Sequence, residues 1–164
     1  MTTPQSIIEA RRFSGRQEHA GPNNGPQLAN MRRALDLPDK PMSWCGVFVS
    51  FCLLRYAVTR KALREALGFG SHWFPESTRD WLAQAACLGM LTDEPEPGDV
   101  FVLVDGSSIA HHMGFVVEVH PGDVDTIEGN TNAGGSPDGD GVYHRVRRRG
   151  TSMKFIRLPL ELKA

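Results

Sequence analysis

The chain has few cysteines and no long apolar run, and these two shortages exclude several classes of protein. Only three cysteines occur in 164 residues and none forms a CxxC pair, so we expect neither a disulfide framework nor a zinc site. No stretch approaches the roughly 18 apolar residues of a membrane helix, so no membrane partner is expected. The formal net charge of -1 gives no general attraction to nucleic acid, which is therefore not expected as a partner either.

The N-terminus also lacks the pattern of a secretory signal. Its first residues, MTTPQSIIEARRF, contain only a short apolar pair between polar and charged residues, whereas a signal peptide needs a longer apolar region. We therefore expect synthesis in the cytoplasm without a signal peptide. If the protein acts outside the cell, other machinery must release or deliver it.

One local excess of charge stands out near the C-terminus. Arg145, Arg147, Arg148 and Arg149 form a basic cluster. Four charges at the end of a strand are more typical of a solvated face than of a polyanion site. The sequence therefore predicts a solvent-exposed strand end here.

Turn residues and apolar spacing divide the chain into a helical part and a later strand-rich part. Helical periodicity, caps and glycine stops predict helices after Thr3 and over 27–37, 43–58, 61–67 and 76–87, with Ser43 as a helix cap. Short β-rich runs predict strands over 100–104, 113–119, 124–128, 142–147 and 154–158. Helices followed by strands indicate an α+β fold with an antiparallel sheet, and we expect one domain over residues 1–164.

Among the three cysteines, Cys45 is the candidate nucleophile. It opens the most apolar predicted helix, WCGVFVSFCLLRYAV, where free backbone amides and the helix dipole favour the thiolate. Cys52 lies two turns further along this helix and Cys87 ends another helix. Both are interpreted as small buried hydrophobic residues.

A base for Cys45 is sought among six histidines, of which His111 and His112 are the best placed. They directly precede the apolar strand MGFVVEV, so the sheet would hold them rigidly while they stay reachable from the loop side. Neighbouring residues in a strand point to opposite faces. His112 is preferred because Gly114 leaves room near it, and His111 remains the alternative.

The base also needs a partner that orients its second nitrogen. The next strand ends in TIEGNTN and presents Glu128, Asn130 and Asn132, one of which antiparallel pairing can bring beside His112. A carboxylate in that place would fix the tautomer and stabilise the imidazolium. The predicted chemistry is acyl transfer through a thioester, without a cofactor.

Three ordered blocks resemble the CHAP family, the cysteine- and histidine-dependent amidohydrolases/peptidases of the papain-like superfamily. They are MSWCGVFVSFCL, PEPGDVFVLV followed by HHMGFVVEV, and TIEGNTN. Weaker likeness extends over residues 5 to 158. The resemblance implies a papain-like fold, with Cys45 as nucleophile, His112 as general base, Glu128 as orienting residue and Asn130 as a further polar active-site residue.

Two features depart from relatives, the residue after the nucleophile and the doubled histidine, which keeps His111 open as the base. Gly46 replaces the alanine that often follows the nucleophile, which we expect to change helix packing more than chemistry. The lead-in AGPNNGPQLAN holds no acidic residue, so the calcium site of some relatives is not expected, and the pair Asp138 and Asp140 is interpreted as a solvated turn. We therefore expect no metal.

Further residues are needed to complete the site. The oxyanion should lie at the start of the Cys45 helix, near its backbone amide and a side chain from the lead-in loop. Asn23, Asn24 and Gln27 are the candidates, of which Asn24 and Gln27 are predicted for this role. Trp44 and Trp73 are the aromatic residues expected to line a substrate cleft, and a place in the core is the alternative for both.

The resemblance supplies the substrate class. It implies a peptidoglycan hydrolase that cleaves the peptide part of the wall, as an N-acetylmuramoyl-L-alanine amidase or an endopeptidase. A phage lysis or tail enzyme and a secreted antibacterial effector both fit, with a phage structural protein or an immunity protein as partner. The alternatives are an intracellular amidase on a small amide and an inactive binding module of the same fold.

Overall fold

A computed structural model describes residues 3–16, 23–132 and 139–163. Within these ranges the helices come first and the strands follow. The helices are α1 (Gln5–Arg11), α2 (Pro26–Ala34), α3 (Cys45–Ala57), α4 (Arg60–Leu67), α5 (Thr78–Cys87) and the short 3-10 helix η1 (Leu160–Leu162). The strands are β1 (Leu91–Thr92), β2 (Val100–Val104), β3 (Ala110–Val119), β4 (Asp123–Thr131), β5 (Gly141–Arg148) and β6 (Met153–Ile156).

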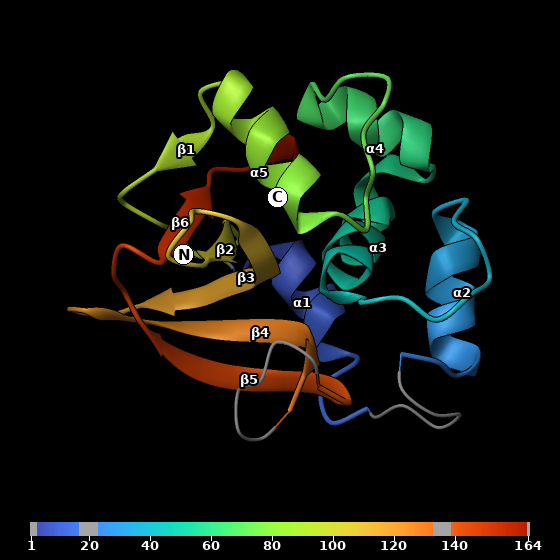
Figure 1. Ribbon diagram of the computed structural model, residues 1–164, viewed down its shortest axis with the longest axis horizontal. Helices are drawn as coiled ribbons and strands as arrows, with labels where there is room; N and C mark the ends of the chain where they lie inside the picture. Colours follow the sequence, from blue (N-terminus) through green and yellow to red (C-terminus); the bar gives the residue numbers. More distant parts are fainter. Residues whose placement is uncertain (1–2, 17–22, 133–138, 164) are drawn as a thin grey trace.

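The strands form one antiparallel sheet in the order β1-β6-β2-β3-β4-β5. Strands β2 to β5 follow one another as a meander, and β6 returns to pair between β1 and β2. Figure 1 shows the helical half of the molecule beside this sheet. The predicted α+β class, with helices packed on a C-terminal antiparallel sheet, is confirmed.

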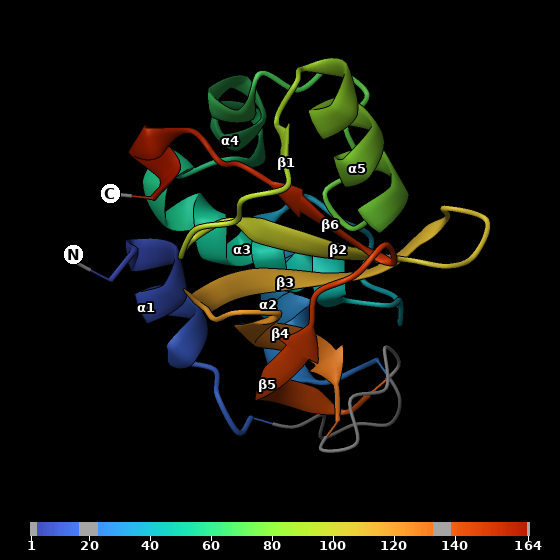
Figure 2. The same ribbon diagram turned by 90° about the vertical axis from the view of Figure 1, so that its left-hand side faces the viewer.

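Helix α3 is the central element of the core. It contacts α1, α2, α4, β3 and β4, and Figure 2 shows it behind the middle of the sheet. Val47, Phe48, Val49 and Leu53 on it are fully buried. Burial on several sides explains why its sequence is almost continuously apolar instead of amphipathic. No helix in the described ranges combines the length and apolarity needed to cross a bilayer.

The predicted boundaries differ from the observed ones in instructive places. Helix α3 begins at Cys45 with Trp44 as its N-cap and no side-chain cap, so the prediction that Ser43 caps this helix is wrong. Helix α2 ends three residues earlier than expected, before Asp36 adopts a left-handed backbone (φ 54°). Strands β3 and β4 are longer than predicted. Strand β3 includes His112 and β4 includes Asn130, and both of these polar residues are buried inside their strands.

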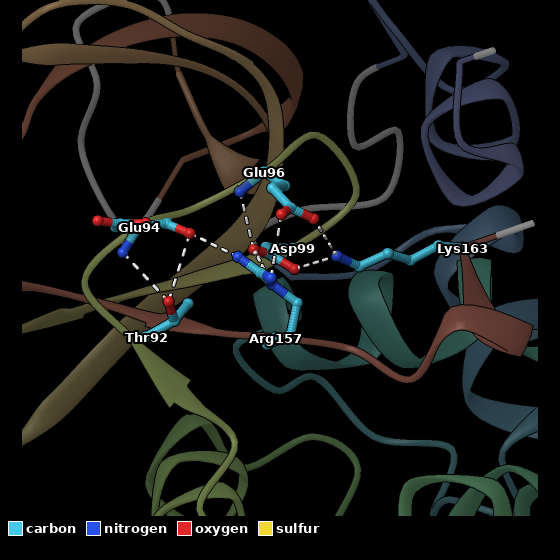
Figure 3. Close-up of polar contacts among 6 residues, drawn as sticks. All are labelled: Thr92, Glu94, Glu96, Asp99, Arg157 and Lys163. Carbon is cyan, nitrogen blue, oxygen red and sulfur yellow. Dashed lines mark hydrogen bonds and ion pairs between the residues drawn. The ribbon is translucent and has the colours of Figure 1, made fainter. Parts of the chain in front are cut away.

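The turn before β2 joins both ends of the described chain. Gly98 has a φ of +91°, and a Cβ there would approach Pro4. Asp99 is fully buried and accepts hydrogen bonds from the Arg157 Nε atom (3.0 Å) and the Glu96 backbone amide (2.8 Å). Its other oxygen lies 2.5 Å from Lys163 Nζ, and Figure 3 shows the carboxylate between the two cations. The motif PGD therefore stabilises the fold by holding this turn against Pro4 near the N-terminus and against Arg157 and Lys163 near the C-terminus.

Candidate active site

Cys45 is the first residue of α3, and its side chain is almost completely buried, at 2% exposure. Backbone amides of Met113, Gly46 and Cys45 itself direct hydrogen bonds at its sulfur. Since Met113 directly follows His112 in β3, the sulfur lies beside the strand segment that carries the histidine. The fold thus brings together two blocks that are far apart in the sequence.

Burial dominates the ionisation of this thiol. Loss of solvent raises the pKa of Cys45 to about 11, and the amide hydrogen bonds at its sulfur only partly offset this effect. The nearby Glu128 charge raises the pKa further. The backbone amides at the helix start lower the pKa of the thiol as expected, but burial outweighs them, so the sulfur needs a proton acceptor before it becomes nucleophilic.

His112 provides a suitably placed imidazole. Its Nε2 atom lies 2.9 Å from an oxygen of Glu128, and both side chains are fully buried. Its other nitrogen, Nδ1, has no hydrogen-bond partner among the described residues. His111 is exposed, and its Nδ1 lies 3.5 Å from the Ile109 carbonyl oxygen. Of the two neighbouring histidines, it is His112 that contacts Glu128.

A glycine makes this pairing sterically feasible. His112 and Glu128 lie inside β3 and β4, not at the strand mouths where the sequence places them. Gly114 shares the face of His112, and a Cβ there would come within 3.1 Å of Glu128 Cγ and 2.6 Å of the Ile127 carbonyl oxygen. The missing side chain leaves the space through which Glu128 reaches the imidazole.

Glu128 is held on its other side by Arg147 from β5. The Arg147 Nε atom donates to one carboxylate oxygen (2.6 Å) and Nη2 to the other (2.5 Å). Burial alone would raise the pKa of Glu128, but hydrogen bonds from Arg147 and His112 outweigh it and hold the pKa at about 2. For Arg147, the interpretation of the basic cluster as a solvated strand end is wrong.

The family model of the CHAP domain matches residues 38–130, more than half of the chain. The chain belongs to the CHAP family. This membership indicates a peptidoglycan hydrolase of the amidase or peptidase type. No curated protein and no solved structure matches the chain.

Asn130 is the last residue of the CHAP match. It is buried in β4, two residues after Glu128. Asn130 has a left-handed backbone (φ 58°), and its carbonyl oxygen accepts a hydrogen bond from the Gly139 amide (3.2 Å). Between Glu128 and Asn130, a Cβ at Gly129 would lie 2.7 Å from side-chain atoms of Phe48 and Trp44. The glycine therefore lets β4 pass directly over the start of the nucleophile helix.

The aromatic residues expected to line a cleft are core residues of this CHAP chain. Trp44 is 3% exposed and packs edge-on against Phe48 at a centroid distance of 6.3 Å. Trp73 is 1% exposed and packs against Phe69 and Trp81. Their burial gives both rings a packing role in the described structure.

The two amide side chains predicted for the oxyanion, Asn24 and Gln27, lie just before α2 and in its first turn. The Asn24 side-chain oxygen accepts hydrogen bonds from the Gly25 amide (2.9 Å) and from Arg32 Nη2 (3.4 Å), so that end of the amide stabilises the loop. Gln27 is half-buried in the first turn of α2. The structure assigns Asn24 a local structural role and leaves the oxyanion role of both residues a prediction.

Potential metal ligands gather elsewhere in the described part of the chain. Ligand atoms of Glu118, His120 and Asp125 lie within 4.8 Å of one another, and His120 Nε2 is 3.3 Å from an Asp125 oxygen. This group lies at the β3–β4 hairpin, at the opposite end of β3 from His112, so it has no part in the chemistry at Cys45. Asp138 and Asp140 are predicted to lie in a solvated turn, and Asp138 lies outside the described residues.

Gly46 next to the nucleophile is tightly packed, and we expect Gly46→Ala to destabilise the protein. A Cβ there would lie 2.5 Å from the Glu76 carbonyl oxygen, and Ser50 one turn later donates to the Pro75 carbonyl oxygen (2.8 Å). Overpacking of this kind costs about 1–3 kcal/mol, measurable by chemical denaturation. Gly150→Ala is the matched control, since a Cβ there meets nothing within 4 Å. Equal stability of the two variants would contradict this packing.

Proposed function

We propose that this protein hydrolyses an amide bond in the peptide part of peptidoglycan, with Cys45 as nucleophile and His112 as general base. One observation carries the proposal. Glu128 binds one nitrogen of a buried imidazole, the other nitrogen is unpartnered among the described residues, and the adjacent Met113 amide contacts the Cys45 sulfur. These positions support the order of nucleophile, base and orienting acid that acyl transfer needs.

The catalytic cycle follows from these positions. His112 Nδ1 accepts the proton of Cys45 as the sulfur attacks the amide carbonyl, because the high pKa of the thiol leaves little free thiolate beforehand. The tetrahedral intermediate expels the amine, which takes the proton from the imidazolium. Water, deprotonated by the same imidazole, then hydrolyses the thioester and restores the thiol.

Glu128 contributes through charge and orientation. As an ionised acceptor at Nε2 it fixes the proton of neutral His112 on that nitrogen, which leaves Nδ1 free to act as a base. It also stabilises the imidazolium formed after proton transfer. We further propose that the oxyanion develops at the start of α3, near the Cys45 backbone amide.

Membership of the CHAP family supports a wall substrate, and the bond is either that of an N-acetylmuramoyl-L-alanine amidase or that of an endopeptidase. We propose a role as a phage lysis or tail enzyme or as a secreted antibacterial effector. In the first case a phage structural protein is the expected partner, and in the second an immunity protein. Action at the cell wall then follows release or delivery by other machinery.

The test is digestion of purified peptidoglycan by the protein and by its Cys45→Ala and Cys52→Ala variants. Mass spectrometry of the fragments identifies the bond, since an amidase frees the amino group of the first stem residue. We expect Cys45→Ala to lower the rate at least about 1,000-fold. Cys52, buried on the same helix, is the matched control. Peptidoglycan left intact by the wild-type protein, or equal digestion by Cys45→Ala, would refute the proposal.

A further inference from the structure

We propose that Arg147 is a positioning residue of this active site, which keeps Glu128 charged and thereby sets the tautomer of His112. The inference rests on the proposed function, because it extends the Cys45, His112 and Glu128 arrangement by a fourth member. Arg147 lies on β5, outside the residues that the family model matches. It does not contact the reacting atoms and acts through Glu128 alone.

The contacts of Arg147 with Glu128 are those of a two-pronged ion pair. Nε and Nη2 each donate to a different carboxylate oxygen, and the Arg147 side chain is only 16% exposed. Thr126, two residues before Glu128 on the same strand face, donates to the oxygen that Nε also binds. Such a planar pair fixes both the position and the rotation of the carboxylate.

Arg147 also supports the ring that packs on His112. Its guanidinium carbon lies 5.8 Å from the centroid of Phe101, a distance typical of a cation–π contact. Phe101 in turn lies 6.1 Å from the imidazole of His112, with the two planes tilted by 53°. One guanidinium therefore contacts both groups that hold the imidazole.

The chemical consequence concerns a proton. Without the guanidinium, burial of Glu128 favours its neutral form. A protonated carboxyl would donate its hydrogen to His112 Nε2, which forces the imidazole proton onto Nδ1. His112 would then have no free lone pair to accept the proton of Cys45, and the attack on the amide would stop.

The charged and titratable groups near Glu128 come from three elements among the described residues. They are His112 from β3, Cys45 at the start of α3, and Arg147 with Arg145 and Tyr143 on the same face of β5. Of the two arginines, it is Arg147 whose guanidinium donates to both oxygens of Glu128. Loss of its charge should therefore move the ionisation of Glu128 toward neutral pH.

The experiment compares Arg147→Gln, Arg147→Lys and Arg149→Gln in peptidoglycan hydrolysis as a function of pH. We expect Arg147→Gln to lower kcat about 100-fold near neutral pH with little change in KM, and to move the acidic limb of the rate profile upward by about one pH unit or more. Arg147→Lys should restore part of the rate because it restores the charge. Arg149 stacks on Phe155 and donates to the Asp93 carbonyl oxygen, so Arg149→Gln should keep the wild-type profile.

A second measurement does not depend on the substrate. Nitrogen-15 NMR of His112 should show the Nε2–H tautomer in the wild-type protein and the Nδ1–H tautomer in Arg147→Gln. An Arg147→Gln variant that keeps the wild-type tautomer and pH profile, and differs only in thermal stability, would overturn the inference. Absence of hydrolysis by the wild type would instead contradict the proposed function. The NMR comparison would still test whether Arg147 sets the tautomer of His112.

Discussion

Replacing His112 with glutamine should abolish peptidoglycan hydrolysis, while the same replacement at His111 should leave it close to the wild-type rate. Glutamine cannot take the proton of Cys45, so the expected loss is about 1,000-fold or more. His111 is the neighbouring residue on the same strand, yet it is exposed and its Nδ1 lies beside the Ile109 carbonyl oxygen, not beside Glu128. Initial rates of fragment release measure the difference.

This pair of variants separates chemistry from folding. Both substitutions lie in β3, so a general disturbance of the strand would lower both rates. Thermal unfolding of each variant shows whether the buried glutamine at position 112 disturbs the core. Substantial hydrolysis by a folded His112→Gln protein would contradict the assignment of the base, and loss in His111→Gln would transfer it to the neighbour.

The second large effect is expected at Glu128, on stability as well as activity. Glu128→Ala leaves the Arg147 guanidinium without its carboxylate in a site that excludes water, and removing one member of such a pair costs about 3–5 kcal/mol. It also frees the imidazole of His112 to rotate. Urea denaturation and the hydrolysis rate should therefore both change, whereas Glu118→Ala on the exposed part of β3 should change neither much.

The same carboxylate should make stability depend on acid. Its pKa in the folded protein is about 2, below the ordinary value of 4.5. Its contribution to folding is therefore complete above about pH 4.5 and is lost as the pH falls from there toward 2, by about 3 kcal/mol in all. Glu128→Gln cannot titrate and should lack this part of the acid dependence. Identical pH dependence of unfolding in wild type and Glu128→Gln would contradict the buried ion pair.

The sequence predicts the chemistry of this site better than its surroundings. Cys45, His112 and Glu128 have residue types and an order along the chain that indicate acyl transfer. Their burial could not be predicted, because it depends on Gly114 and Gly129, whose role is to let backbone segments approach closely. A glycine in a strand signals a close approach, but the sequence does not say to which neighbour.

Arg147 shows why charge runs mislead. Four nearby arginines indicate a solvated strand end, but neighbouring residues of a strand point to opposite faces of the sheet. Arg147 reaches from β5 to Glu128 on the neighbouring strand β4, while Arg148 lies on the opposite face of β5. The alternation from Val142 to Arg147 was the available signal. For Trp44 and Trp73 the sequence leaves cleft and core open, because an aromatic side chain suits both, and their burial decides for the core.

The burial of Cys45 has a consequence for the chemical durability of the protein. Peroxides and disulfides react with thiolates, and far more slowly with protonated thiols that solvent cannot reach. A sulfur with 2% exposure and a pKa of about 11 is therefore shielded from oxidants while the enzyme is idle. For the proposed wall hydrolase, which we propose acts outside the reducing cytoplasm, this burial would keep the nucleophile in usable form until a substrate reaches it.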